Sequence, residues 1–472
     1  MKTLIPFFLL VFLSFSIFLS GCSPDEEFGT DPIGSLSFST DTLSFDTVFS
    51  KLSTPTAWLI IRNNGSKKIK ISGITLKDGG TNGFRINIDG VSAKSFSDVE
   101  IPAKDSLFLF VALTPLEQGS GQPFAISDAL IFQSEGIQKQ IVLEAYSLDA
   151  VTWHGKTIQS DTTLTADFPY HIYDSLVVAK NTTLTIREGT TLYFHNKAKL
   201  VVHGKILATG SALAPITLRG DRLDEILPGF LYDIYPGQWE SVRLSESSFE
   251  NVLNYVHIRG ANSGIIADSS SSELVKLKMT NSIIHNMTEN CIWSCNNKMS
   301  IANSQLTNSG SNTVSLFGGW YDFTHCTLAN YQDMVESRSG STLFLCNNFE
   351  KINYPLHAVF FNCIVFGSNF SEVDTLMSSQ STWNIQFKNC MLRSLEWPSS
   401  MAAGCVYPKE PKFLKIDYDT EKFDFRLDSV SEARFAADSV YSKQYPYDMN
   451  GIDRLGDGKP DIGAYEWTTG QK

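Results

Sequence analysis

The strongest constraint on this chain is a short pattern that recurs between residues 275 and 392. A polar residue stands at four positions separated by 22 residues each and recurs twice more at unequal steps, with apolar residues alternating before and after it. Alternation with a period of two predicts β-strands, and a repeat of about 20–30 residues predicts a solenoid of stacked turns. The polar column is Asn281, Asn303, His325, Asn347, Asn362 and Asn389.

We expect this column to form a ladder at one corner of the solenoid. Parallel strands of successive turns stack about 4.8 Å apart, so each amide reaches the next one and the local backbone. A leucine-rich repeat has a similar length, but the required leucine framework is absent. The pattern resembles the right-handed parallel β-helix family, and the resemblance covers about residues 150–415. It implies three short strands per coil and says little about chemistry.

The region before the repeat predicts a different β-fold. Residues 35–149 contain alternating strands such as "AWLIIRNNG" and "SLFLFVAL", separated by glycine-rich turns. Short strands at this spacing favour a β-sandwich. The order of these segments resembles immunoglobulin-like (Ig-like) domains of the Hydin-related type. The predicted fold is therefore all-β, with an Ig-like sandwich followed by a right-handed parallel β-helix.

Residues 416–472 predict a segment that closes the solenoid. The motif "DIGAYE" at 461–466 resembles the closing segment of many bacterial β-helix proteins, and a solenoid needs a polar cap on its last coil. We favour a turn-rich cap over a calcium site, because the spacing of the oxygen-bearing residues does not match an EF-hand. Those residues are Asp448, Asn450, Asp453, Asp457 and Asp461. We expect no cofactor and no metal site, since Cys291 and Cys295 stand alone without a cysteine–histidine set.

The N-terminus predicts attachment to a membrane. An apolar run within residues 1–21 reads as a signal peptide, and it is short for a spanning helix. The sequence Leu19-Ser20-Gly21-Cys22 resembles a bacterial lipobox, which implies acylation of Cys22 with palmitate-type chains. Residues 22–34 form a polar tether. Its acidic start resembles the surface-export signal of Bacteroidota lipoproteins, which implies an outer-membrane location facing outward; a plain tether on the periplasmic face is the alternative.

Charge narrows the class of partner. The formal net charge is -12, and the chain has no basic tract. This excludes the electrostatic footprint of a nucleic-acid-binding protein. The same negative field repels acidic polysaccharides unless a local basic groove receives them. The partners that remain are the membrane, through the lipid, and a polysaccharide.

One predicted outward face carries a candidate glycan-binding strip. Ammonium groups pair with carboxylates or sulfates, and an indole ring stacks on the apolar face of a sugar. The alternative is a solvated sheet surface that lysines protect from edge pairing. The strip consists of Lys276, Lys278, Lys298, Trp320, Asp322 and Lys388.

The sequence favours a binding protein over an enzyme. Inverting glycosidases need two carboxyl groups about 6.5–9.5 Å apart, and Asp322 has no acid one coil away. The motifs of polygalacturonases are also absent, so we name no catalytic residue. We therefore expect a lipid-anchored, non-catalytic protein that binds a glycan or a surface. A polysaccharide lyase or hydrolase and a structural surface spacer are the alternatives.

Overall fold

The computed structural model describes residues 28–227, 230–333, 338–407 and 409–470. Cys22 and most of the predicted tether lie outside the described residues. The chain divides into two compact units, and the boundary after the first falls between Leu148 and Asp149. Nearly all regular structure is β, so the predicted all-β class is confirmed.

The first unit consists of two five-stranded sheets around one core. The strand orders are β1-β3-β8-β5-β6 and β2-β10-β9-β4-β7. Inward residues of both sheets, such as Leu59, Phe84 and Leu130, are fully buried against one another. The strands are β1 (Leu36–Phe38), β2 (Thr42–Phe49), β3 (Ala57–Asn63), β4 (Ile69–Leu76), β5 (Phe84–Ile88), β6 (Val91–Ala93), β7 (Ser95–Ile101), β8 (Ser106–Leu113), β9 (Phe124–Ser134) and β10 (Ile137–Leu148).

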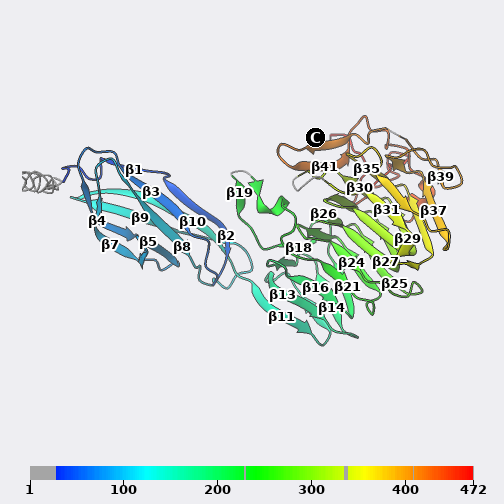
Figure 1. Ribbon diagram of the computed structural model, residues 1–472, viewed down its shortest axis with the longest axis horizontal. Coiled ribbons are helices and arrows are strands. Elements are labelled where there is room, and N and C mark those ends of the chain that lie inside the picture. The colour runs from blue at the N-terminus through cyan, green and yellow to red at the C-terminus, as the bar shows by residue number, and fades with distance from the viewer. Residues whose placement is uncertain (1–27, 228–229, 334–337, 408, 471–472) are drawn as a thin grey trace, which may run out of the picture. The chain divides into compact units, whose positions relative to one another are not determined.

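The second unit is a parallel β-helix, which confirms the predicted solenoid. Among its described residues, 25 principal strands pair in parallel with the strands one coil away and form three long sheets, which we call sheets A, B and C (Figure 1). The first strands are β11 (Val151–Ile158), β12 (Thr162–Leu164), β13 (Tyr170–Val178), β14 (Thr183–Arg187), β15 (Thr191–Phe194), β16 (Lys199–Val202), β17 (Lys205–Thr209), β18 (Ile216–Gly220), β21 (Val242–Leu244), β22 (Asn251–Asn254), β23 (Val256–Arg259) and β24 (Ile265–Ala267). The later strands are β25 (Val275–Thr280), β26 (Ile283–Met287), β27 (Ile292–Ala302), β28 (Gln305–Ser309), β29 (Val314–Thr324), β30 (Thr327–Asn330), β31 (Leu343–Cys346), β34 (Leu356–Phe361), β35 (Ile364–Gly367), β36 (Val373–Leu376), β37 (Trp383–Lys388), β38 (Met391–Leu392) and β39 (Ala402–Ala403).

Each coil contributes one strand to each sheet. Sheet A contains the first half of β11 and of β13, then β15, β18, β23, β26, β28, β30, β35 and β38. Sheet B contains the second half of β11 and of β13, β16, β21, β24, the first half of β27 and of β29, β31 and β36. Sheet C contains β12, β14, β17, β22, β25, the second half of β27 and of β29, β34, β37 and β39.

The alternating apolar residues fill one continuous core inside the three sheets. Phe323, Phe360 and Phe387 stack ring on ring, with 4.9 Å between successive centroids. This spacing matches the distance between neighbouring strands, so inward residues of the same kind stack from coil to coil.

The polar column lies at the corner between sheets C and A, with one exception. Asn281, Asn303, His325, Asn362 and Asn389 follow strands of sheet C that pair coil by coil. Their φ angles lie between 46° and 54°, a left-handed conformation that Asn tolerates better than most residues. Asn303 donates to Asn281 at 3.3 Å, and Asn362 lies 3.0 Å from the ring of His325.

The prediction that Asn347 belongs to this column is wrong. Asn347 follows β31, which pairs with the first half of β29 in sheet B. Its amide instead donates to the backbone oxygens of Ser378 and Ser381. The short hairpin β32 (Asn348–Phe349) and β33 (Ile352–Asn353) is inserted after it, so the next strand of sheet C begins later, at Leu356.

The C-terminal segment lies along the side of the solenoid, which corrects the expectation of an end cap. It contains β40 (Phe413–Asp417), β41 (Lys422–Leu427) and the short helix α2 (Ser439–Ser442). It runs back along the asparagine corner and is bonded to the column residues in turn. The last coil is covered instead by Trp397, whose ring packs against Phe387 at 5.2 Å.

A second core lies between this C-terminal segment and the outer face of late sheet A. Phe366 and Met391 of sheet A are buried against Phe425, Ile462 and Tyr465. Earlier coils of sheet A carry a different cover. Residues 221–227 and 230–236 leave the coil and form β19 (Glu225–Leu227), β20 (Phe230–Leu231) and the 3-10 helix η1 (Tyr232–Ile234). The outer face of sheet A between these two covers is where the candidate site lies.

Candidate functional site

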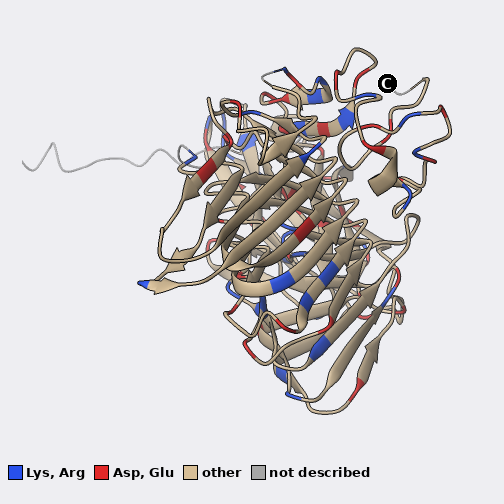
Figure 2. Cartoon of the chain, turned by 90° about the vertical axis from the view of Figure 1, so that its right-hand side faces the viewer, with Lys and Arg blue, Asp and Glu red and all other residues tan. Residues whose placement is uncertain are grey.

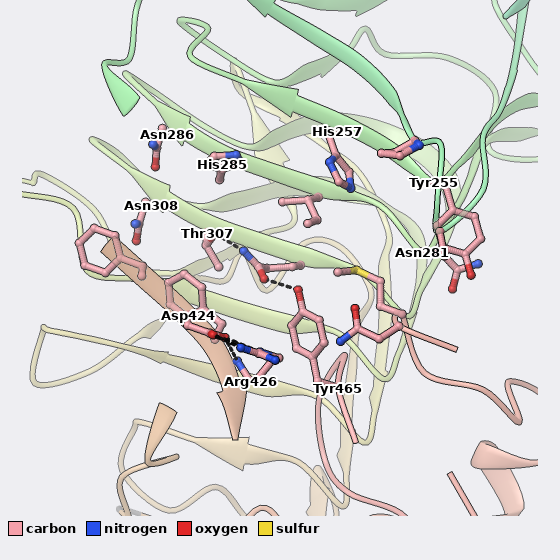
Figure 3. Close-up of a pocket in the computed structure, with 18 of the residues that line it drawn as sticks. Tyr255, His257, Asn281, His285, Asn286, Thr307, Asn308, Asp424, Arg426 and Tyr465 are labelled. Carbon is pink, nitrogen blue, oxygen red and sulfur yellow. Dashed lines mark hydrogen bonds and ion pairs between the residues drawn. The ribbon is translucent and has the colours of Figure 1, made fainter. Parts of the chain in front are cut away.

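A groove of about 620 Å³ lies on the outer face of sheet A. Its floor comes from β23, β26 and β28, and its far wall comes from β41 and the segment around Tyr465 (Figure 3). The lining residues are Ala212, Leu213, Pro215, Ile234, Tyr255, His257, Asn281, Ile283, His285, Asn286, Gln305, Thr307, Asn308, Glu421, Phe423, Asp424, Phe425, Arg426, Met449, Asn450 and Tyr465.

The strands of sheet A place polar side chains on the floor because every second residue points outward. His285 pairs with Thr307 on the next coil, and Arg259 precedes them in the same row. His257 and Gln305 lie in the adjacent row, two coils apart. Among the residues that the structure describes, none donates to or accepts from the ring nitrogens of His257, so this ring is available to a ligand.

The far wall is fixed by hydrogen bonds to the floor. The hydroxyl of Tyr465 donates to Oε1 of Gln305 at 2.6 Å, and Nε2 of Gln305 donates to Thr307 at 3.0 Å. Arg426 donates to the carboxylate of Asp424 through Nε and Nη2, as the dashed lines in Figure 3 show. This pairing neutralises the charges of Asp424 and Arg426, so the lining part of the wall offers mainly uncharged groups.

The two imidazoles of the floor are neutral at physiological pH. Burial, reinforced by the nearby Arg259 cation, lowers the pKa of His257 to about 4 and that of His285 to about 4. Arg259 is itself held by Asp233, with Nε 2.9 Å from the carboxylate. A neutral imidazole both donates and accepts a hydrogen bond, which suits a hydroxyl group as ligand.

One carboxyl group at the groove is protonated near neutrality. Burial, together with a hydrogen bond and the charge of Asp333, raises the pKa of Glu421 to about 8. Asp424 behaves in the opposite way: burial opposes ionisation, but the hydrogen bonds from Arg426 hold its pKa below the usual value. The groove therefore contains one neutral acid and one paired carboxylate.

The lysine and tryptophan strip lies elsewhere, on sheet C. Lys278 and Asp322 occupy one outward row, and Lys298 and Trp320 occupy the next. The ring of Trp320 is 38% exposed and stacks on His357 at 4.7 Å, while Lys388 lies 5.6 Å from the ring of Phe361. Figure 2 shows Lys and Arg as isolated blue segments on otherwise tan strands, not as a continuous basic surface.

Lys276 does not belong to this strip, which corrects the sequence prediction. The side chain is fully buried, its ammonium donates to the backbone oxygen of Ser245 at 2.5 Å, and it lies 5.0 Å from the ring of Phe249. The cause is a register shift in β25 between Val275 and Leu277, so that Val275 takes the row expected for Lys276. Burial lowers the pKa of Lys276 to about 8.

The acidic residues Asp448 and Asp461 near the C-terminus accept hydrogen bonds from backbone amides. Asp448 accepts hydrogen bonds from the amides of Asn450, Ile452 and Glu466. Asp461 accepts from the amides of Phe435 and Trp467. Their oxygens are thus directed at backbone donors of the turn-rich segment, and the geometry gives no support to a calcium site there.

Sequence reasoning missed the groove because its two walls are far apart in the chain. The floor comes from residues 255–308 and the far wall from residues 421–465. A sequence signal was available, because His257 and His285 alternate with the apolar residues Ile258 and Ile284, which point into the core. The sequence does not show which sheet each strand joins, so it could not show that His257 and His285 lie on the same face.

Comparisons with known proteins leave the family open. No family model matches the chain, and no curated protein matches it in sequence. A solved structure of the catalytic domain of a family 87 α-1,3-glucanase in complex with nigerose is similar, at 10% identity over 72% of this chain and 82% of that chain, with a TM-score of 0.24.

Two further solved structures match smaller parts. A family 123 glycoside hydrolase from Clostridium perfringens, described for glycolipid glycan hydrolysis, matches at 7% identity over 25% of this chain, with a TM-score of 0.18. A protein of unknown function from Porphyromonas gingivalis W83 matches at 10% identity over 27% of this chain, with a TM-score of 0.18. The chain spans 30% and 61% of the lengths of these two proteins.

No helix among the described residues is long and apolar enough to cross a membrane.

Proposed function

We propose that this chain is a lipid-anchored protein of the cell envelope whose β-helix binds an uncharged glycan in the groove on sheet A. The observation that carries the proposal is the composition of that groove. Two neutral imidazoles, the amides of Asn286 and Asn308 and the hydroxyl of Thr307 surround a space of about 620 Å³. Sugar hydroxyls both donate and accept hydrogen bonds, which is what these groups offer.

Aromatic rings supply the second requirement of a sugar site. Tyr465, Phe423 and Tyr255 line the groove, and the apolar face of a pyranose stacks on such rings. The charge of the groove distinguishes neutral from acidic glycans. Arg426 is neutralised by Asp424 at 2.5 Å, so the described lining residues offer no unpaired Lys or Arg to a uronate or sulfate. A neutral glycan is therefore the better ligand.

The remaining parts of the proposal rest on the sequence. The lipobox-like Leu19-Ser20-Gly21-Cys22 supports lipidation of Cys22 and anchoring in the outer membrane, and the acidic residues after it support a surface-exposed orientation. The first unit would then be an Ig-like module between the anchor and the β-helix.

We expect the variant H257A to weaken binding of a neutral polysaccharide at least about tenfold, because it removes a ring whose nitrogens face the groove. The matched control is W320A, which truncates a partly exposed ring of the lysine and tryptophan strip on sheet C. Retention of wild-type and variant proteins on a panel of immobilised neutral and acidic polysaccharides measures the effect.

Each outcome decides between the alternatives. Loss in H257A with wild-type behaviour of W320A supports the groove, and the reverse result transfers the site to the strip on sheet C. Retention of acidic glycans alone contradicts the electrostatic part of the proposal. If no glycan of either kind is retained, a structural spacer becomes the better explanation.

Hydrolysis is a second candidate, and Glu421 is the observation that favours it. A carboxylic acid with a raised pKa at a sugar-sized groove is what a glycosidase uses to protonate the leaving oxygen. In that case wild-type protein releases reducing ends from a neutral glycan, and E421Q lowers the rate more than about a hundredfold. The control D419N changes an exposed acid in the same turn and should leave the rate unchanged. Binding without new reducing ends in the wild type excludes this candidate.

A further inference from the structure

Three side chains from consecutive coils meet on the outer face of early sheet A. Nε2 of His171 and Nδ1 of His195 lie 2.9 Å and 2.7 Å from the same oxygen, Oδ2 of Asp221. One potential ligand atom from each of the three residues lies within 4.8 Å of the other two. Two imidazole nitrogens therefore lie at hydrogen-bond distance from one carboxylate oxygen, and the three donor atoms form a compact cluster.

The β-helix holds these residues in register. Ile172, Phe194 and Gly220 pair as neighbours in β13, β15 and β18. His195 and Asp221 follow these strands directly, and their amides donate to the coil below, to Ile172 at 2.8 Å and to Phe194 at 3.1 Å. Because the backbone of each donor is fixed by a neighbouring coil, the cluster is preorganised.

The surroundings leave one side of the cluster open. The side chain of His171 is 1% exposed and that of Asp221 is 13% exposed, whereas His195 is 47% exposed. The ring of Tyr173 packs against both imidazoles, with centroids 4.6 Å and 4.5 Å away. An ion held by the three donors would be enclosed by protein on one side and reached by water or an external ligand on the other.

The two guanidinium groups near the cluster are paired with other acidic residues. Arg219 lies 3.0 Å from Asp233 and also donates to the backbone oxygens of Gly220 and Arg222. Arg222 is paired with Asp224 at 2.5 Å. Neither guanidinium is paired with Asp221, so the carboxylate keeps its charge for an ion.

We propose that His171, His195 and Asp221 bind Zn²⁺ or a divalent transition metal ion of the same class. Zn²⁺ binds imidazole nitrogen and carboxylate oxygen at about 2.0–2.2 Å, which places ligand atoms roughly 3.3 Å apart in a tetrahedral site. The two nitrogen–oxygen distances here, 2.9 Å and 2.7 Å, are shorter than this spacing, and the three donor atoms lie within 4.8 Å of one another, so an ion requires both nitrogens to move slightly away from Oδ2. Ca²⁺ and Mg²⁺ prefer oxygen donors and do not suit two imidazoles.

Two imidazoles and one carboxylate are a typical ligand set of metal sites in which one coordination position is open to exchange. Three protein ligands leave a fourth position for water or an external ligand, as in catalytic zinc sites, whereas structural zinc sites are closed by four protein ligands. Each imidazole coordinates as a neutral ring that carries its proton on the other nitrogen. This metal site is separate from the groove on sheet A, because the ion pairs of Asp233 with Arg219 and Arg259 lie between them. Metal binding is therefore proposed independently of glycan binding.

The test is metal binding by the full chain after removal of metal with a chelator. We expect one Zn²⁺ per chain in isothermal titration, and visible absorption of a coordinated ion when Co²⁺ replaces it. H195A and D221N, which change the two more exposed donors, should each weaken Zn²⁺ binding more than about tenfold. H357A removes a histidine from sheet C and should bind Zn²⁺ as the wild type does.

The alternative is that Asp221 only joins two histidines by hydrogen bonds. It predicts no stoichiometric Zn²⁺ binding, or the same affinity in wild type, H195A and D221N; either result overturns the proposal. Circular dichroism of both variants checks that the β-helix is intact. Binding of Ca²⁺ at the same site in place of Zn²⁺ would also contradict it.

Discussion

Replacing Arg454 by methionine should detach the C-terminal segment from the asparagine corner. Arg454 is fully buried and donates to Glu466 at 2.7 Å, to Asn303 at 2.9 Å and to the backbone of Ala464 at 3.2 Å. The variant R454M leaves the buried carboxyl group of Glu466, whose pKa burial raises to about 8, without its guanidinium partner, and it removes the donor to Asn303 and Ala464. Breaking a buried pair by removing one partner costs about 3–5 kcal/mol, which is a large part of the stability of a typical domain.

Hydrogen exchange followed on peptides of residues 430–467 is the most direct measurement. In the wild type the amides of Ile462 and Gly463 are bonded to Ala433 and Asn362, so they are protected until the segment opens. R454M should exchange them at least about a hundredfold faster, whereas peptides of β14 and β17 should keep their protection. The same variant should raise the susceptibility of the segment to proteolysis.

The control is R222M, which removes an arginine from an exposed pair with Asp224. Such pairs contribute about 0–1 kcal/mol, and no change in the C-terminal peptides is expected. The double variant R454M/E466Q removes the uncompensated charge and should recover part of the protection. If R454M exchanges like R222M, the buried pair does not fasten the segment.

The fold was predictable because packing repeats itself in the sequence. Every coil of a β-helix must place apolar residues over those of the coil below, as Phe323, Phe360 and Phe387 do, and this requirement leaves a periodic record. The corner was predictable for a local reason. Its left-handed backbone favours Asn, so five of the six column residues could be found without knowing any contact.

The errors arose where spacing alone does not identify a strand. Asn347 follows His325 by the same interval as the earlier steps, yet its strand β31 belongs to sheet B and the hairpin β32–β33 intervenes before the next strand of sheet C. Lys276 was misplaced by a register shift of one residue, which turns a side chain to the other face of a strand. Both errors were caused by local changes in the backbone, an inserted hairpin and a register shift, which the periodic sequence pattern does not reveal.

The candidate sites were hidden for a different reason. The groove needs the C-terminal segment to return to coils that lie more than a hundred residues earlier, as the bond from Tyr465 to Gln305 shows. The cluster of His171, His195 and Asp221 spans three coils whose lengths differ, so no fixed motif describes it. The sequence shows the residue types, but only the winding of the chain brings them together.

Acidification should destabilise the β-helix unit between pH 6.5 and pH 4, because two partly buried imidazoles must then acquire protons. An unfolded histidine has a pKa of about 6.5, whereas His257 and His285 in the fold have pKa values of about 4. The folded chain binds fewer protons than the unfolded chain in this window, so stability is complete above pH 6.5 and declines as the pH falls towards 4. Each imidazole contributes on the order of 3 kcal/mol to this decline.

The double variant H257N/H285N isolates this contribution. Urea unfolding of the β-helix unit at several pH values should give a steep loss of stability in the wild type and a shallower one in the variant, while carboxyl groups affect both equally. H357N, which removes a histidine from sheet C and keeps both groove imidazoles, should follow the wild-type curve.

Protonation of the two groove imidazoles also places positive charge beside Arg259, so the affinity for a neutral glycan should fall over the same pH range. Parallel stability curves for wild type and H257N/H285N would show that burial does not keep these rings neutral, and the hydrogen-bonding character assigned to the groove would have to be abandoned.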